Sequence, residues 1–165
     1  NEPFVAIWGD EFIYSNPPRA RQCIEVFEKY GDPGISAVRV PKGDVSRYGI
    51  VDAANIEKNI WQINKLIEKP AIEEAPSNLA AHGCYVLTPD IFEALEKTKV
   101  GRGGELWLVD GIFKLLKKRP VYARAVEGTY YDTGSKLGYL KANVDFALRD
   151  ENLKKDLKKY LRTFI

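Results

Sequence analysis

The stretch that decides the fold class is residues 4–40, FVAIWGDEFIYSNPPRARQCIEVFEKYGDPGISAVRV. It begins with the apolar run Phe4 to Trp8, which is typical of a buried strand. The prolines at 17 and 18 favour a helix start, and apolar residues follow them at helical spacing. Residues 35–40 then form a second apolar run, which predicts another buried strand. The order strand, helix, strand predicts a layered α/β fold.

The rest of the chain extends this pattern. Further strands are predicted at 49–52, 60–67, 79–87, 121–126 and 129–131, with a surface loop at 70–78. Helices are predicted after Thr88-Pro89, with Ile91, Phe92 and Leu95 inward, and around Leu106, Val109, Ile112, Phe113 and Leu116. Residues 101–104 are expected to form a flexible turn before that second helix. A long amphipathic helix carries Leu137, Leu140, Val144 and Leu148. We therefore expect a mixed β-sheet with helices on both faces.

Bulk composition is that of an ordinary globular protein. The chain has 165 residues, of which 45% are apolar and 29% charged, with a net charge of +2. This charge favours no nucleic-acid partner, and no apolar run approaches the length of a membrane span. The two cysteines, Cys23 and Cys84, are expected to be buried, reduced thiols of a cytoplasmic protein. The chain begins with Asn1 and contains no methionine, so we expect either that its N-terminus was removed or that it is a piece of a longer protein.

Two acidic residues follow predicted strands. Asp10 comes directly after the first strand, where open α/β sheets place their ligands, although Gly-Asp turns are also common at strand ends. Asp132 ends a later aromatic strand, just before a glycine turn and a helix start. If the two carboxylates converge, they could hold Mg²⁺ against substrate phosphates. Ser135 could simply cap the helix, and Lys136 could either meet a phosphate or be a surface lysine.

A second group of candidates lies near the middle of the chain. Glu68 and Lys69 follow each other at a strand end and are expected to point to opposite faces. A carboxylate can accept hydrogen bonds from sugar hydroxyls and an ammonium can neutralise a phosphate, but a plain surface pair remains the alternative. Gly49 would let the backbone approach a ligand closely, or it could serve only as a turn glycine.

Five segments of the chain together resemble one enzyme family. They are NEPFVAIWGDEF (1–12), VPKGDVSRYGIVD (40–52), LIEKPAIEEAPSNLAAHGCYVLTPDIFEALEKT (66–98), GRGGELWLVDGI (101–112) and YYDTGSKLGYLKANVDFALRD (130–150). In order and spacing they resemble blocks of the bacterial and archaeal UTP–glucose-1-phosphate uridylyltransferases, from Asn1 to about Asp150. The combination of SRYGIVD, EKP followed by APSN, and KLGYLKAN is specific to that family.

The resemblance implies a fold and a reaction. The fold is a truncated Rossmann-like, glycosyltransferase-A-like nucleotidyltransferase domain over residues 1–149. The helical spacing of Leu153, Leu157, Leu161 and Phe164, and not the resemblance, predicts a C-terminal amphipathic helix over 150–165. The reaction converts UTP and glucose 1-phosphate to UDP-glucose and pyrophosphate with Mg²⁺, by positioning and electrostatic stabilisation rather than covalent catalysis.

The resemblance also assigns residues to roles. By position, Asp10 and Asp132 match the metal-binding aspartates, and Lys69 matches the ammonium that meets the sugar phosphate. Glu68 matches the carboxylate that holds sugar hydroxyls. The remaining assignments are Gly49 for backbone contact with the sugar, Ala81 for the pocket lining and Lys136 for the phosphates.

The chain departs from the family pattern in several places. Glu11, Trp107 and Val109 replace the usual residues, and His82 stands beside the pocket where an aliphatic residue is common. The glycine-rich G-x-G-T-R loop that cradles the triphosphate does not occur in the sequence. We therefore expect this chain to be inactive alone and to associate, with its missing N-terminal half or with itself. The alternative is a catalytically silent sugar-phosphate-binding or oligomer-assembly module.

Overall fold

The computed structural model describes residues 2–100 and 104–164. They form two compact units, each described here by itself. The first unit contains β1 (Phe4–Ile7), α1 (Arg19–Tyr30), β3 (Gly34–Arg39), the 3-10 helix η1 (Lys42–Arg47), β4 (Gly49–Glu57), β5 (Ile60–Glu68), β6 (Leu79–Leu87), α2 (Asp90–Glu96), α3 (Leu108–Leu115) and β7 (Tyr122–Ala125). The second contains β2 (Glu11–Tyr14), β8 (Thr129–Asp132), α4 (Lys136–Arg149) and α5 (Lys154–Leu161). Among the described residues, no helix combines the length and apolar character that crossing a bilayer requires.

The first unit is built on a six-stranded mixed sheet in the order β1-β6-β3-β7-β5-β4. The β3–β7 pair is parallel, whereas the other pairs are antiparallel. An additional pairing of Ile50 with Ala80 joins β4 to β6, so the sheet curls back on itself. This curl brings the first residues of β4 and the first residues of β6 together. The predicted mixed sheet is confirmed.

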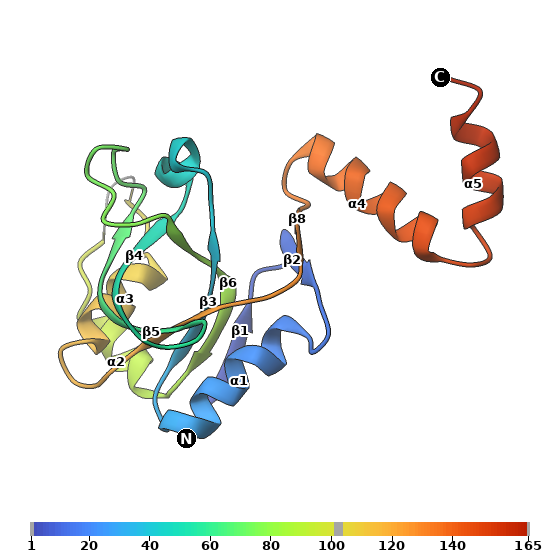
Figure 1. Ribbon diagram of the computed structural model, residues 1–165. Coiled ribbons are helices and arrows are strands. Elements are labelled where there is room, and N and C mark those ends of the chain that lie inside the picture. Colours follow the sequence, from blue (N-terminus) through green and yellow to red (C-terminus); the bar gives the residue numbers. More distant parts are fainter. Residues whose placement is uncertain (1, 101–103, 165) are drawn as a thin grey trace. The chain divides into compact units, whose positions relative to one another are not determined.

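Helices cover both faces of this sheet, as Figure 1 shows. The larger apolar core joins α2 and α3 to one face, with Tyr85 and Leu87 of β6 among its members. The intervening residue of β6, Val86, belongs to a separate cluster with Cys23 of α1. Because side chains alternate along a strand, these two clusters lie on opposite faces. The layered α/β prediction is therefore confirmed.

The two cysteines lie in the α1 layer. Both are fully buried and neither forms a disulfide, as predicted. A hydrogen bond with Cys84, together with burial, raises the pKa of the Cys23 thiol far above its usual range. The pair therefore behaves as part of the apolar core, packed between α1 and β6.

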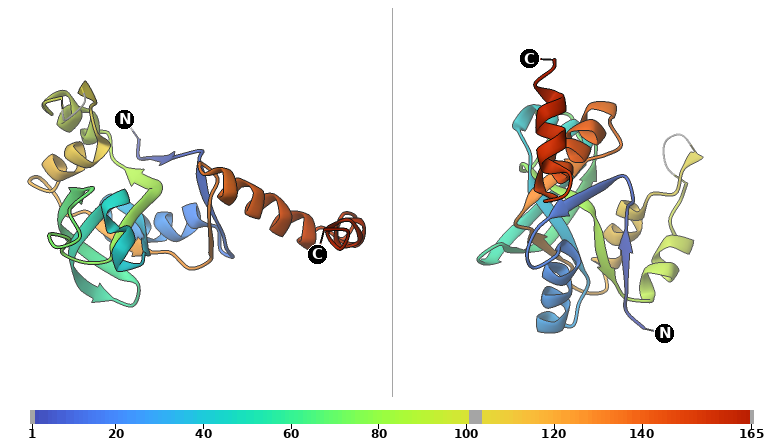
Figure 2. Two further views of the ribbon diagram at one scale, coloured as in Figure 1. Left: turned by 90° about the horizontal axis from the view of Figure 1, so that it is seen from above. Right: turned by 90° about the vertical axis from the view of Figure 1, so that its right-hand side faces the viewer.

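The second unit is a two-stranded antiparallel sheet followed by two helices. Its strand β2 was not among the predicted elements, because the four residues EFIY follow the first strand after only a short interruption. Phe12 stacks on Tyr131 at a centroid distance of 5.0 Å, and Phe146 of α4 contacts both rings edge-on. Figure 2 shows α5 turning sharply away from the axis of α4.

Several predicted inward faces are wrong in detail. Phe92, Leu106 and Phe113 are exposed, whereas Ala94, Gly111 and Leu115 are buried in their neighbourhood. In α4, Leu137 and Leu140 are 63% and 60% exposed, and Ala142 is buried instead. The predicted turn at 101–104 lies outside the described residues except for Gly104, which has φ of 82°.

Candidate functional site

The predicted sugar-binding residues meet where β4 begins and β5 ends. In the antiparallel register Gly49 lies directly opposite Glu68. A Cβ atom on Gly49 would lie 3.0 Å from Oε2 of Glu68 and 3.6 Å from Cγ2 of Val109. The carboxylate of Glu68 therefore packs closely over the backbone of Gly49, where a larger residue would displace it.

Lys69 follows Glu68 with a left-handed backbone, φ 46°. Its N–H donates to the carbonyl of Tyr48, 3.0 Å away, which closes the end of the strand pair. This turn brings Nζ of Lys69 to 4.0 Å from Oε1 of Glu68. The expectation that the two side chains point to opposite faces is wrong, because the strand ends at Glu68 and the alternation ends with it. The ammonium and the carboxylate can thus address one ligand together.

Burial decides the electrostatics of Glu68. Its side chain is only 21% exposed, and this burial raises the pKa of its carboxyl above the ordinary glutamate value. Lys69 lowers this pKa and Asp110, in the first turn of α3, raises it further. Glu68 therefore holds its proton more strongly than a surface glutamate, and a hydroxyl-rich ligand would find a partly desolvated acceptor.

Ala81 lies on the sheet face covered by α3, and His82 lies on the other. Ala81 packs against the apolar core that also contains Leu66 and Val109. The ring of His82, the next residue of β6, lies 4.9 Å from that of Tyr48, and its side chain is buried. The structure thus groups Ala81 with the Gly49 side of the sheet, while the expectation that His82 lies beside the pocket is wrong for its side chain.

The two predicted metal-binding aspartates come together in the second unit. β2 pairs with β8 so that Glu11 lies opposite Asp132, and Asp10 directly precedes this pair. The carbonyl of Asp10 accepts hydrogen bonds from the N–H and Oγ1 of Thr133, at 3.0 and 2.9 Å. A Cβ atom placed on Gly134 would lie 3.4 Å from Oδ1 of Asp132 and 3.7 Å from Cβ of Asp10. The carboxylate of Asp132 and the backbone and Cβ of Asp10 therefore border the same glycine turn.

A tight turn into α4 fixes the position of Asp132. Its Oδ1 accepts hydrogen bonds from the N–H groups of Gly134 and Ser135, at 3.1 and 3.2 Å. Ser135 caps the helix as anticipated, because its Oγ accepts from the N–H of Gly138 at 3.1 Å. Lys136 is the exposed first residue of that helix. Lys136 therefore follows the turn that contains Asp132 closely in the sequence.

The two aspartate carboxylates fit Mg²⁺ that is bound jointly with substrate phosphates better than they fit a metal ion bound by protein side chains alone. The described part of the chain contains no cluster of three or more acidic, cysteine or histidine side chains that could hold an ion. A pair of carboxylates is the arrangement that Mg²⁺ commonly uses when substrate phosphates supply further oxygen ligands. Asp10 and Asp132 can provide that pair.

Asp110 was missed as a site residue by sequence reasoning. It lies in the segment GGELWLVDGI, where only the neighbouring positions Trp107 and Val109 attracted notice. The structure places it where its charge acts on Glu68. A carboxylate in the first turn of a helix is usually explained by the helix dipole, so the sequence offered no separate signal for this role.

Comparison with known proteins places the chain in a family. A model of the nucleotidyl transferase family matches residues 1–148. The UTP–glucose-1-phosphate uridylyltransferase of Staphylococcus epidermidis is 40% identical over 162 residues, which make up 98% of this chain and 56% of that protein. UTP–glucose-1-phosphate uridylyltransferase 1 of Staphylococcus saprophyticus is 40% identical over 163 residues, which make up 99% of this chain and 57% of that protein.

Solved structures agree with this relationship. A UDP-glucose pyrophosphorylase complexed with UDP-glucose has 35% identity and a TM-score of 0.85, covering 91% of this chain and 58% of that one. The UDP-glucose pyrophosphorylase of Acinetobacter baumannii has 30% identity and a TM-score of 0.88, and the match covers 99% of this chain and 57% of that one. The chain spans little more than half the length of the curated relatives it matches. The family model and the shared mixed α/β fold together show that this chain belongs to the nucleotidyl transferase family.

Proposed function

We propose that this chain supplies the sugar-binding residues and the metal-binding carboxylates of a UTP–glucose-1-phosphate uridylyltransferase. In this reaction a phosphate oxygen of glucose 1-phosphate attacks the α-phosphorus of UTP, and pyrophosphate leaves. The observation that carries the proposal is the β2–β8 pairing, which brings Asp10 and Asp132 from distant parts of the chain to one turn. The relatives' names supply the substrates.

In the proposed mechanism the first unit binds the sugar phosphate. The carboxylate of Glu68 accepts hydrogen bonds from sugar hydroxyls, and the ammonium of Lys69, 4.0 Å away, neutralises the phosphate. Gly49 would contact the sugar through its backbone beside the carboxylate of Glu68, and Ala81 would line the pocket from β6. These contacts orient the attacking oxygen, and orientation is a large part of catalysis in phosphoryl-type transfer.

In the same mechanism the second unit helps to neutralise the negative charge of the triphosphate. Asp10 and Asp132 would hold Mg²⁺, which on binding withdraws charge from the triphosphate and stabilises the departing pyrophosphate. The hydrogen bonds that Gly134 and Ser135 donate to Oδ1 hold the Asp132 carboxylate in a fixed orientation. Lys136, exposed at the start of α4, adds a positive charge for a phosphate group.

The experiment that tests the proposal follows release of pyrophosphate from UTP and glucose 1-phosphate with Mg²⁺. It is run on this chain alone and on a fusion that adds the remaining segments of the Staphylococcus epidermidis relative. We expect turnover in the fusion, and a fall of about 100-fold or more in kcat when Asp132→Asn removes a metal ligand. Glu2→Gln, an exposed acidic residue, is the matched control. Undiminished turnover in the Asp132→Asn fusion would refute the assignment.

The catalytically silent module remains a second candidate. The observation behind it is that the given sequence contains no G-x-G-T-R motif. Under this hypothesis the chain binds glucose 1-phosphate through Glu68 and Lys69 but releases no pyrophosphate, even in the fusion. Calorimetric titration with glucose 1-phosphate separates this outcome from complete lack of function.

We further propose that the chain associates, with itself or with a complementary segment. The support is the row of exposed apolar side chains on the last two helices, including Leu137 at 63%, Leu140 at 60% and Tyr160 at 61% exposure. Exposed patches of this kind commonly mark protein–protein interfaces. Sedimentation equilibrium should give a mass above the 18.7 kDa of one chain, and a monomer across the whole concentration range would contradict the proposal.

A further inference from the structure

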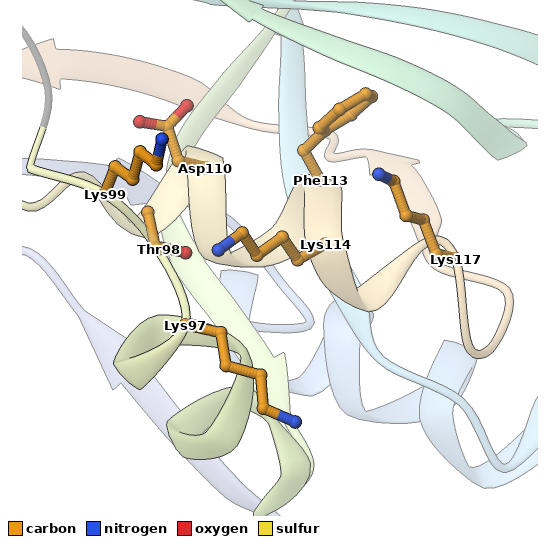
Figure 3. Close-up of a pocket in the computed structure, with 7 residues that line it drawn as sticks. All are labelled: Lys97, Thr98, Lys99, Asp110, Phe113, Lys114 and Lys117. Atoms are coloured by element: carbon orange, nitrogen blue, oxygen red, sulfur yellow. The ribbon is translucent and has the colours of Figure 1, made fainter.

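A basic pocket lies on the α3 side of the first unit, separate in composition from the predicted sugar-binding residues. Its volume is about 370 Å³, which is at the small end of the range of ligand sites. Four lysines line it, Lys97, Lys99, Lys114 and Lys117, together with Thr98, Asp110 and Phe113. Figure 3 shows that they come from the segment that follows α2, from one side of α3 and, for Lys117, from the turn after α3.

The positive charges of this pocket are only partly neutralised. Lys97 pairs with Glu93 of α2 at 2.5 Å. Within residues 2–100 and 104–164, Lys99, Lys114 and Lys117 form no ion pair. Asp110 is the one acidic side chain in the lining. Three lysines without an ion pair outnumber the single carboxylate of Asp110 around this concave surface, and the remaining positive charge attracts an anion.

The pocket also offers an apolar contact. The ring of Phe113 is 39% exposed, although it is a large apolar side chain on a helix whose other face is buried. The ammonium of Lys117 lies 5.7 Å from the centre of this ring. A flat or apolar group could therefore cover Phe113 while an attached anion meets the lysines.

We propose that this pocket binds a small molecule with a phosphate or diphosphate group attached to a planar or apolar portion. The phosphate lies against Lys99 and Lys114, and the planar portion lies over Phe113. Thr98 adds a hydroxyl that can donate to a phosphate oxygen. The ligand class includes nucleotides. The lining contains neither Glu68 nor Lys69, although it includes Asp110, whose charge also acts on Glu68.

The test is a nuclear magnetic resonance titration of the whole chain with UDP, in EDTA so that no metal-dependent site responds. We expect saturable shifts at the amides of Thr98, Asp110 and Phe113. Uridine, which has no phosphate, should cause none of them. Inorganic pyrophosphate should shift Thr98 but bind more weakly than UDP, because it leaves Phe113 uncovered. This comparison distinguishes a nucleotide from a free phosphate ligand.

Variants make the test decisive. Lys99→Gln and Lys114→Gln should each weaken UDP binding about fivefold, the effect of one close charge pair in water. Phe113→Ala should weaken UDP binding but leave pyrophosphate binding unchanged. Lys58→Gln, an exposed lysine outside the pocket, is the matched control and should bind like the wild type. Unchanged affinity in the Lys99→Gln/Lys114→Gln double variant, or shifts confined to residues outside the pocket, would overturn the proposal.

Discussion

Substitution of Gly138 by alanine tests how Asp132 is positioned. Gly138 lies in the first turn of α4, and an added Cβ would overlap the carbonyl oxygen of Asp132. It would also approach Oγ of Ser135 at 2.6 Å and the carbonyl carbon of Asp132 at 3.0 Å. The opposing atoms are mainly backbone of the strand that pairs with β2, so they cannot rotate away. The substitution must therefore displace either α4 or Asp132.

The magnitude follows from two opposing effects. Overpacking typically costs about 1–3 kcal/mol, and a clash with backbone belongs at the upper end of that range. Alanine in place of glycine inside a helix stabilises by about 1 kcal/mol. The net expectation for Gly138→Ala is a loss of about 2 kcal/mol in the free energy of unfolding. A change of this size is about thirtyfold in the folding equilibrium constant.

Urea unfolding followed by circular dichroism measures this loss. The matched control is Gly43→Ala, because a Cβ on Gly43 meets no atom within 4 Å. Its unfolding free energy should stay within about 1 kcal/mol of the wild type, on the stabilising side. If Gly138→Ala is as stable as Gly43→Ala, the close packing of α4 against Asp132 is not a feature of the protein, and the argument for a fixed metal-binding turn is refuted.

Three further predictions concern acidity, capping and the core. Asp110→Asn should lower the raised pKa of Glu68, so the loss of glucose 1-phosphate binding on acidification, measured by calorimetry, should move to lower pH; an unmoved profile would separate Asp110 from the site. The free energy of unfolding depends on pH in the opposite direction to ligand binding. The raised pKa of Glu68 favours the folded state at low pH, and this contribution disappears as pH rises through that pKa. Ser135→Ala removes the cap of α4 and should cost about 1 kcal/mol in urea unfolding; no loss would mean that the cap is not formed. Cys23 and Cys84 should resist a thiol reagent in the native protein and react fully in urea, whereas native reactivity would contradict their complete burial.

Sequence periodicity predicted much of the fold because most elements bury one face. The strands β3, β5 and β6 agree with the prediction closely, since apolar runs indicated β3 and β6 and a partial alternation indicated β5. The short strand β2 escaped notice because four residues carry too little periodic signal. The inward face of α4 was also mispredicted, since periodicity shows that a helix is amphipathic but not what covers its apolar side.

The candidate site was predictable as a set of residues but not as a geometry. Glu68 and Lys69 were chosen for their chemistry, and their contact depends on the left-handed backbone of Lys69, which no composition rule indicates for a lysine. The influence of Asp110 on Glu68 likewise depends on how α3 packs beside β5. Tertiary packing supplies both features, and for that reason they appear only in the structure.

The central claim is that this chain provides the sugar-binding residues and the metal-binding carboxylates but not the phosphate-cradling loop. The most direct measurement compares pyrophosphate release by the chain alone, by the fusion with the relative's remaining segments, and by the fusion carrying Asp10→Asn. Turnover only in the unaltered fusion, with a loss of about 100-fold or more in the variant, is the predicted result. Turnover by the chain alone, or a fusion indifferent to Asp10→Asn, would contradict the account.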